Sequence, residues 1–222
     1  MRDSNKVKIK IIRHGKTPLN ERHCYIGSTD EPLSENGIKE LKELSKKNIY
    51  GNVEKVFVSP MKRACMTKDV IYEGVEFEII EEFRELDFGS FEGKNYEELK
   101  DNLHYRKWVD KSRGVSDEEL NKIYGKYHLS DENITLPEEM ANYKSRVSKG
   151  LKSVLKKSKG FNTISIVAHG GTLMAIAEEY LNEDYYKTML KNGEGLELEI
   201  DYTENDGDIE ISHISICDRI CA

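Results

Sequence analysis

Two stretches of the chain decide its fold: residues 6–15, KVKIKIIRHG, and residues 163–171, TISIVAHGG. In the first stretch, charged and aliphatic residues alternate before two isoleucines, which is typical of a β-strand over residues 6–12. In the second, residues 163–168 are largely apolar, as expected of a buried strand in a parallel sheet. Both predicted strands run almost directly into a histidine and a glycine, so the same two stretches also point to a site.

Further strands and helices are predicted to alternate around these two stretches. Ser34 is expected to cap a helix with aliphatic residues at helical spacing. Ser59 is expected to cap another helix, with Pro60 as its first residue. A long helix is predicted to begin at Pro137, and another to follow residue 171. The remaining predicted elements are strands at residues 53–58, 75–79, 196–201 and 209–216, with a hairpin turn at Asn205-Asp206-Gly207.

This alternation predicts an α/β fold with a mostly parallel central sheet and helices on both of its faces. The chain has 222 residues and contains no internal repeat, low-complexity tract or interdomain linker, so residues 1–222 are predicted to form a single domain. Residues 90–136 are polar, rich in tyrosine and weakly periodic. We interpret them as a small inserted cap over the edge of the sheet.

Composition restricts the class of protein. Hydrophobic residues make up 37% of the chain and charged residues 34%, as in globular proteins. The net charge of −7 argues against a nucleic-acid surface, and no apolar run is long enough for a membrane helix. The N-terminus lacks the apolar core of a secretory signal, and the four cysteines form no CxxC pair. We therefore expect a cytoplasmic protein with no membrane or nucleic-acid partner, and reduced cysteines.

Cationic and reactive side chains follow three of the predicted strands. Arg13 and His14 follow the first strand, Arg63 lies shortly after the strand at 53–58, and His169 follows the strand at 163–168. The carboxyl ends of parallel strands meet at one edge of a sheet, so these side chains are expected to converge. Arginine forks bind phosphate oxygens in pairs, and imidazole can act as a nucleophile. A compact anion such as a phosphoryl group suits this set.

Other phosphate-binding and metal-binding sites do not fit the spacing. A P-loop ending at Gly15-Lys16-Thr17 needs a glycine where Lys10 stands. No cysteine is followed six positions later by the arginine that a cysteine phosphatase loop requires, and residues 193–198 do not read GxGxxG. A two-histidine metal site lacks a carboxylate set nearby in sequence, and the arginines would repel the ion. No metal site and no cofactor are expected.

Five motifs occur in fixed order along the chain. The first is RHGKTPLN at residues 13–20. The others are GSTDEPL at 27–33 with Gly37, SPMKRA at 59–64 with Thr67, ELDFG at 85–89 with Glu92-Gly93, and HGG at 169–171. They extend over most of residues 9–181 and together resemble the histidine phosphatase superfamily, which contains the cofactor-dependent phosphoglycerate mutases. The resemblance implies a phosphoglycerate mutase-like α/β fold, a phosphohistidine at His14 and no metal.

The resemblance also implies roles for individual residues. His14 is the expected nucleophile and Glu85 the expected proton donor, which a leaving alkoxide needs. The other residues implied in the site hold the transferred phosphoryl group or shape its pocket, and they are Arg13, Gly15, Asn20, Gly27, Arg63, His169 and Gly170.

Three positions depart from the family pattern and bear on substrate contacts. Residues 137–140 read PEEM where the family often has a Pro-Gly-Glu-Ser-like segment, Met174 stands where an arginine is common, and Leu19 stands where mutases usually carry tryptophan.

Hydrolase and mutase share this core, so the choice between them depends on the surrounding segments. The chain lacks the extended basic insertion that mutases usually carry after Glu92-Gly93, and ELDFGSFEG at 85–93 is most similar to α-ribazole-phosphate phosphatases and broad-specificity relatives. We predict a phosphomonoester hydrolase for a small phosphorylated metabolite, with α-ribazole 5'-phosphate as one candidate. Two alternatives remain: a phosphoglycerate mutase, and a non-catalytic protein that binds a phosphorylated ligand.

Overall fold

The computed structural model describes residues 5–127, 129 and 134–221, and it divides into two compact units. Unit 1 holds residues 5–17, 30–85 and 144–221, and unit 2 holds residues 18–29 with the described part of 86–143. The predicted insertion at 90–136 falls within unit 2, which begins earlier, ends later and also takes in residues 18–29. Its role as a cap and the organisation as a single domain remain predictions.

A six-stranded sheet in the described residues forms the centre of unit 1, in the order β3-β2-β4-β1-β5-β6. β3, β2, β4 and β1 are parallel, and β5 and β6 continue the sheet in antiparallel pairing. The predicted mostly parallel α/β sheet is therefore confirmed. The strands are β1 (Asn5–Arg13), β2 (Lys55–Val58), β3 (Phe77–Ile79), β4 (Thr163–Ala168), β5 (Gly195–Asn205) and β6 (Asp208–Ile220).

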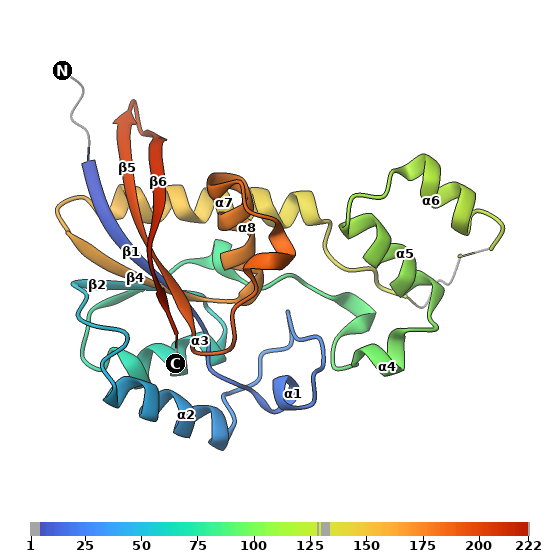
Figure 1. The fold of residues 1–222 in the computed structure, drawn as a ribbon, viewed down its shortest axis with the longest axis horizontal. Helices are drawn as coiled ribbons and strands as arrows, with labels where there is room; N and C mark the ends of the chain where they lie inside the picture. Colours follow the sequence, from blue (N-terminus) through green and yellow to red (C-terminus); the bar gives the residue numbers. More distant parts are fainter. Residues whose placement is uncertain (1–4, 128, 130–133, 222) are drawn as a thin grey trace. The chain divides into compact units, whose positions relative to one another are not determined.

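Helices cover both faces of this sheet, as predicted (Figure 1). α2 and α3 pack on one face, where Leu41 and Ala64 contact a buried cluster that includes Ile12, Val58 and Val167 of the sheet. α8 and most of α7 lie on the other face (Figure 1). The helices of unit 1 are α2 (Glu35–Lys46), α3 (Lys62–Ile71), α8 (Gly170–Leu181), the short 3-10 helices η1 (Glu81–Phe83) and η3 (Tyr185–Thr188), and, from residue 144 onward, α7 (Met140–Lys157).

Of the two predicted serine caps, one is confirmed and the other is wrong. Ser34 caps α2, accepting a hydrogen bond from the Gly37 amide at 2.9 Å. The predicted cap at Ser59 is wrong: α3 begins at Lys62 after Met61, because the Ser59 hydroxyl bonds His169 instead. The long helix begins at Met140, three residues after the proline that the prediction chose.

The predicted hairpin between the last two strands is confirmed. β5 ends at Asn205 and β6 begins at Asp208, so Asp206 and Gly207 form the turn. Both turn residues have positive φ, 49° and 88°. This is the conformation that a two-residue hairpin loop of the Asp-Gly type requires.

Unit 2 is built from short helices around an aromatic cluster. Phe91, Leu99 and Tyr105 are buried at its centre, and Tyr25, Phe88 and Trp108 pack against them. Tyr25 also bonds the Tyr105 hydroxyl at 2.7 Å. The helices of unit 2 are α1 (Pro18–Glu21), η2 (Gly89–Phe91), α4 (Tyr96–Leu99), α5 (Leu103–Ser112) and α6 (Asp117–Tyr124).

Two further observations concern the whole described chain. None of its helices combines the length and the apolar character that crossing a bilayer demands. All four cysteines are free thiols, in agreement with the prediction that they are reduced.

Candidate active site

The carboxyl ends of three adjacent parallel strands bring the predicted residues of unit 1 together. β1 pairs with β4 through Arg13 and Ala168, and β4 pairs with β2 through Val167 and Val58. The residue after each strand therefore lies at the same edge of the sheet. The rings of His14 and His169, 155 positions apart in sequence, lie edge to face with centroids 5.1 Å apart.

His14 is buried, with one ring nitrogen committed to the backbone. Its Nδ1 lies 2.6 Å from the carbonyl oxygen of Gly15. Because a carbonyl can only accept, Nδ1 carries the proton, and the lone pair of a neutral ring is on Nε2. Burial, with the charges of Arg63 and Arg13, lowers the pKa of His14 well below 6.5. The ring is therefore neutral at pH 7, with Nε2 free to attack.

Gly15 connects His14 to helix α3. Its amide donates to Oγ1 of the buried Thr67 at 2.9 Å, and the Thr67 hydroxyl donates to the carbonyl of Arg63 at 2.6 Å. A side chain at Gly15 would place its Cβ 2.5 Å from a methyl carbon of Leu41. The close packing and the amide bond together explain why a residue without a Cβ follows His14.

Two arginines, Arg13 and Arg63, lie near His14 and His169. Arg63, in the first turn of α3, is completely buried, which is rare for a charged side chain and needs anionic or dipolar partners. Arg13 donates through Nη1 to the Leu190 carbonyl at 2.6 Å, while its buried Nε has no hydrogen-bond partner in the described residues. The Arg13 guanidinium also lies against Gly170, where an added Cβ would be 3.4 Å away. Both arginines therefore hold positive charge inside the site.

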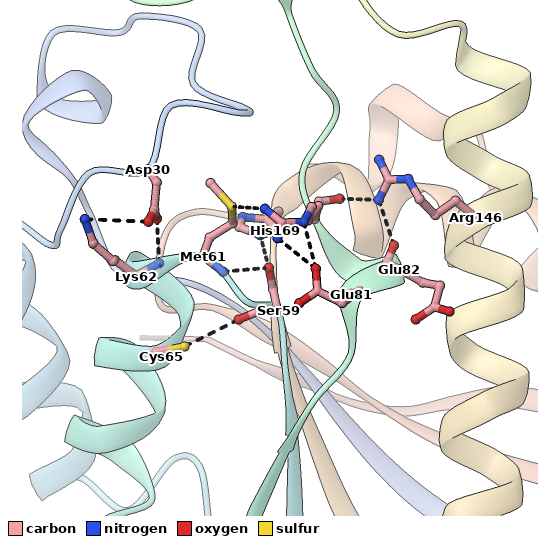
Figure 2. A network of polar contacts seen from close by, with 10 residues as sticks. Asp30, Ser59, Met61, Lys62, Cys65, Glu81, Glu82, Arg146 and His169 are labelled. Atoms are coloured by element: carbon pink, nitrogen blue, oxygen red, sulfur yellow. Dashed lines mark hydrogen bonds and ion pairs between the residues drawn. The ribbon is translucent and has the colours of Figure 1, made fainter.

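His169 is held by a hydroxyl and presents its other nitrogen. Its Nε2 lies 2.7 Å from Oγ of Ser59, which accepts from the Met61 amide at 3.4 Å (Figure 2). The buried Nδ1 has no partner in the described residues. Burial, with the charges of Arg63 and Arg13, lowers the pKa of His169 well below 6.5. In the ligand-free site the ring of His169 is therefore neutral at pH 7.

The neutral ring of His169 can still donate a hydrogen bond. The Met61 amide only donates, so the Ser59 hydroxyl accepts from it and can give its own proton to Nε2 of His169. That direction leaves the proton of the ring on Nδ1, the nitrogen without a hydrogen-bond partner among the described residues. Such a nitrogen suits a phosphoryl oxygen.

The side-chain carboxylate of Glu85 lies at the first turn of helix α8. Its Oε2 accepts from the Gly171 amide at 3.2 Å, in the first turn of the helix that His169 caps. Burial lowers the pKa of Arg13, and the charges of Glu85 and Glu194 offset part of that lowering. Glu85 therefore lies beside the same group of cations as the two histidines.

Arg146 of α7 fixes the segment that leads to Glu85. Its Nη1 donates to the carbonyl oxygens of Glu82 and Arg84, each at 2.8 Å (Figure 2). The sequence prediction did not include Arg146, because its partners are backbone atoms that no side-chain motif reveals.

Two predicted residues, Asn20 and Gly27, belong to unit 2, and their part in the site stays a prediction. Asn20 lies in α1. The Gly27 amide donates to the Glu92 carboxylate, which also accepts from the amides of Ser28, Thr29 and Phe88. A Cβ at Gly27 would fall 1.7 Å from the Leu86 carbonyl oxygen, so this glycine is required by the packing of unit 2 itself.

The residues that follow η3 form a second backbone support that the sequence prediction missed. The side-chain Nδ2 of Asn192 donates to the His14 carbonyl at 3.0 Å, and the backbone amide of Gly193 donates to the Arg13 carbonyl at 3.0 Å. Tyr50 in turn donates to the Gly193 carbonyl at 2.9 Å. A glycine with φ of 81° at 193, directly after an asparagine, is a turn signal, but it does not reveal which strand end the turn contacts.

No group of three His, Cys, Asp or Glu side chains that could hold a metal ion occurs in the part of the chain that the structure describes. Cations from side chains, not acidic ligands, dominate the strand ends. The expected absence of a metal and of a cofactor remains a prediction.

Comparison with known families agrees with the motifs. The family described as the histidine phosphatase superfamily (branch 1) matches residues 9–207. The chain therefore belongs to this family, and the resemblance inferred from its motifs is confirmed.

Particular relatives carry three different activities in their names. Phosphoserine phosphatase 1 of Hydrogenobacter thermophilus is 31% identical over 127 residues, which are 54% of this chain and 60% of that protein. The structure of phosphoglycerate mutase from Bacillus anthracis matches with a TM-score of 0.67 at 24% identity, over 95% of this chain and 93% of that one. The α-ribazole phosphatase of Shigella flexneri matches with a TM-score of 0.63 at 19% identity, over 94% and 96% of the two chains. The two structural matches establish the fold.

Proposed function

We propose that this protein is a phosphomonoester hydrolase in which His14 is transiently phosphorylated. The observation that carries the proposal is the state of the His14 ring: buried, neutral, and with Nδ1 bonded to the Gly15 carbonyl. Such a ring can use its Nε2 lone pair on phosphorus, as nucleophilic catalysis requires. The proposed nucleophile thus needs no further activation by a base.

Charge on the transferred group is balanced by side chains in this proposal. The equatorial oxygens of the phosphoryl group accept hydrogen bonds from the guanidinium groups of Arg13 and Arg63 and from the Nδ1–H group of His169. Donors fixed before the substrate arrives stabilise the transition state without reorganising. The enzyme therefore works without a metal ion.

Glu85 supplies and removes the protons. Its carboxyl group, which the Gly171 amide contacts at Oε2, gives a proton to the leaving alkoxide. The resulting carboxylate then takes a proton from water as that water attacks phosphorus, breaks the bond to Nε2 of His14 and releases inorganic phosphate. Two in-line displacements give retention of configuration at phosphorus.

The substrate proposed is a small phosphorylated metabolite. Relatives named for phosphoserine, α-ribazole phosphate and phosphoglycerate make these three compounds the first to screen. The net charge of −7 supports a small substrate over nucleic acid. The four free cysteines support a reducing, cytoplasmic location.

Two assays together separate the proposed hydrolase from its two alternatives. The protein should hydrolyse p-nitrophenyl phosphate after exhaustive EDTA treatment, and vanadate should inhibit it. A second assay with 3-phosphoglycerate and 2,3-bisphosphoglycerate should show little phosphoryl exchange. Predominant exchange would identify a mutase, binding of phosphate esters without turnover would identify a non-catalytic protein, and activity restored only by a divalent ion would contradict metal independence.

A further inference from the structure

The loop formed by residues 190–194, between η3 and β5, is hydrogen-bonded to the end of β1, directly before His14. The Leu190 carbonyl accepts from Nη1 of Arg13 at 2.6 Å, and the Arg13 amide donates to the Glu194 carbonyl at 2.9 Å. The Gly193 amide donates to the Arg13 carbonyl at 3.0 Å and lies 3.3 Å from the His14 carbonyl. The 190–194 loop thus contacts both the side chain and the backbone of the strand end.

Within this loop, the side chain of Asn192 contacts the backbone of both His14 and the residue after it. Its Nδ2 donates to the His14 carbonyl oxygen at 3.0 Å and to the Gly15 carbonyl oxygen at 3.4 Å. In an extended strand, successive carbonyls point to opposite sides. Two successive carbonyls that meet one amide nitrogen therefore mark a sharp bend of the chain directly after His14.

The second of these carbonyls is the one that holds the ring of His14. Oxygen of Gly15 accepts from Nδ1 of His14 at 2.6 Å and also from Nδ2 of Asn192. β1 ends at Arg13, so strand pairing does not set the direction of the Gly15 carbonyl. The Asn192 amide is placed to set it.

We infer that Asn192 is a positioning residue that keeps the Gly15 carbonyl within reach of Nδ1 of His14 and thereby keeps the lone pair of the ring on Nε2. The inference rests on the proposed function of His14 as nucleophile. Asn192 acts through the backbone and needs no contact with the phosphoryl group. The hydrogen bond from its side-chain amide to the His14 carbonyl holds the bend of the chain after His14. The longer bond to the Gly15 carbonyl holds the oxygen that accepts from Nδ1 of His14.

Two substitutions remove the amide donor in different ways. Asn192→Ala deletes the group, while Asn192→Asp keeps its size but replaces the donor with a carboxylate that repels both carbonyl oxygens. Lys191→Ala is the matched control, because it alters the exposed neighbouring side chain and leaves the loop backbone in place. If one variant fails to fold, the other still tests the inference.

The direct readout is the tautomer of His14, measured by nitrogen-15 NMR on histidine-labelled, ligand-free protein. The wild type and Lys191→Ala should show His14 protonated on Nδ1 alone. Both Asn192 variants should show a mixture of the two tautomers. Their kcat/KM for p-nitrophenyl phosphate should fall about tenfold, as for the loss of one ordinary hydrogen bond, while the inhibition constant of vanadate changes much less.

A single Nδ1-protonated tautomer in both Asn192 variants would overturn the inference, even if their melting temperature or activity had fallen, because the residue would then be merely structural. The NMR experiment needs no turnover. If the wild type hydrolysed no phosphate ester, the proposed function would fail while the tautomer measurement still decided the role of Asn192.

Discussion

Thr67→Val tests whether helix α3 holds the turn that contains His14. Oγ1 of the fully buried Thr67 accepts from the Gly15 amide at 2.9 Å and donates to the Arg63 carbonyl at 2.6 Å. Valine has the same shape but lacks the hydroxyl. The Arg63 carbonyl keeps its helical bond from the amide of residue 67, whereas the Gly15 amide loses its partner. The substitution therefore leaves one buried donor unsatisfied.

The size of the effect follows from that donor. An unsatisfied buried amide costs about 1–3 kcal/mol of the free energy of unfolding. For a chain of this length each kcal/mol lowers the melting temperature by about 2–4 °C, so Thr67→Val should lower it by about 2–12 °C. Thr67→Ser keeps the hydroxyl and loses one methyl group, which is worth about 0.8 kcal/mol. Serine should therefore be the milder substitution.

Thermal unfolding and turnover of p-nitrophenyl phosphate are measured on the same three proteins. Thr67→Val should lose kcat/KM as well as stability, because the Gly15 peptide also carries the carbonyl that bonds Nδ1 of His14. Thr67→Ser should keep most of both. A valine variant as stable and as active as the wild type, or a serine variant that is the worse of the two, would refute this reasoning.

Three further predictions concern the proton donor Glu85, the pKa of His14 and the charge of Arg63. Glu85→Gln should lower kcat/KM for an alkyl phosphate much more than for p-nitrophenyl phosphate, whose leaving group needs less help from an acid, and equal losses would remove Glu85 from the acid role. Because burial and Arg63 lower the pKa of His14, and the attacking ring must be neutral, the acidic limb of kcat/KM should lie below pH 6.5. Arg63→Met removes a cation that lowers this pKa, so it should move the acidic limb to higher pH; an unchanged or lower position would contradict the proposed proximity of the two groups.

Much of the fold and of the site was predictable because the decisive signals are local. The apolar run at 163–168 and the alternation at 6–12 predicted two strands of a mostly parallel sheet, and in the structure these strands pair in parallel. Strand ends in a parallel sheet meet at one edge, so the convergence of His14 and His169 followed from the pattern alone.

The supports of the site were not predictable from local signals. Asn192 and Arg146 bond backbone carbonyls at positions far away in sequence, and these contacts depend on the tertiary path of the chain. Ser59 followed by proline is a good local signal for a helix cap, but the Ser59 hydroxyl is hydrogen-bonded to the buried His169 instead.

The polar segment at 90–136 held more local information than its weak periodicity indicated. Asn95 and Ser116 each begin a capping box, with Glu98 and Glu119 three residues later, and both start short helices in the structure. A search for caps in place of hydrophobic periodicity would have found α4 and α6.

The central claim is that phosphate passes through Nε2 of His14. Acid-free, alkaline quenching of the wild-type protein during turnover, followed by peptide mapping, should recover a base-stable, acid-labile phosphoryl group on His14, carried on Nε2. His14→Ala, which truncates a buried side chain just after the end of β1, should still fold, trap no phosphate and lose turnover. Phosphate recovered on another residue, or a His14→Ala protein that keeps a substantial part of wild-type activity, would contradict the account.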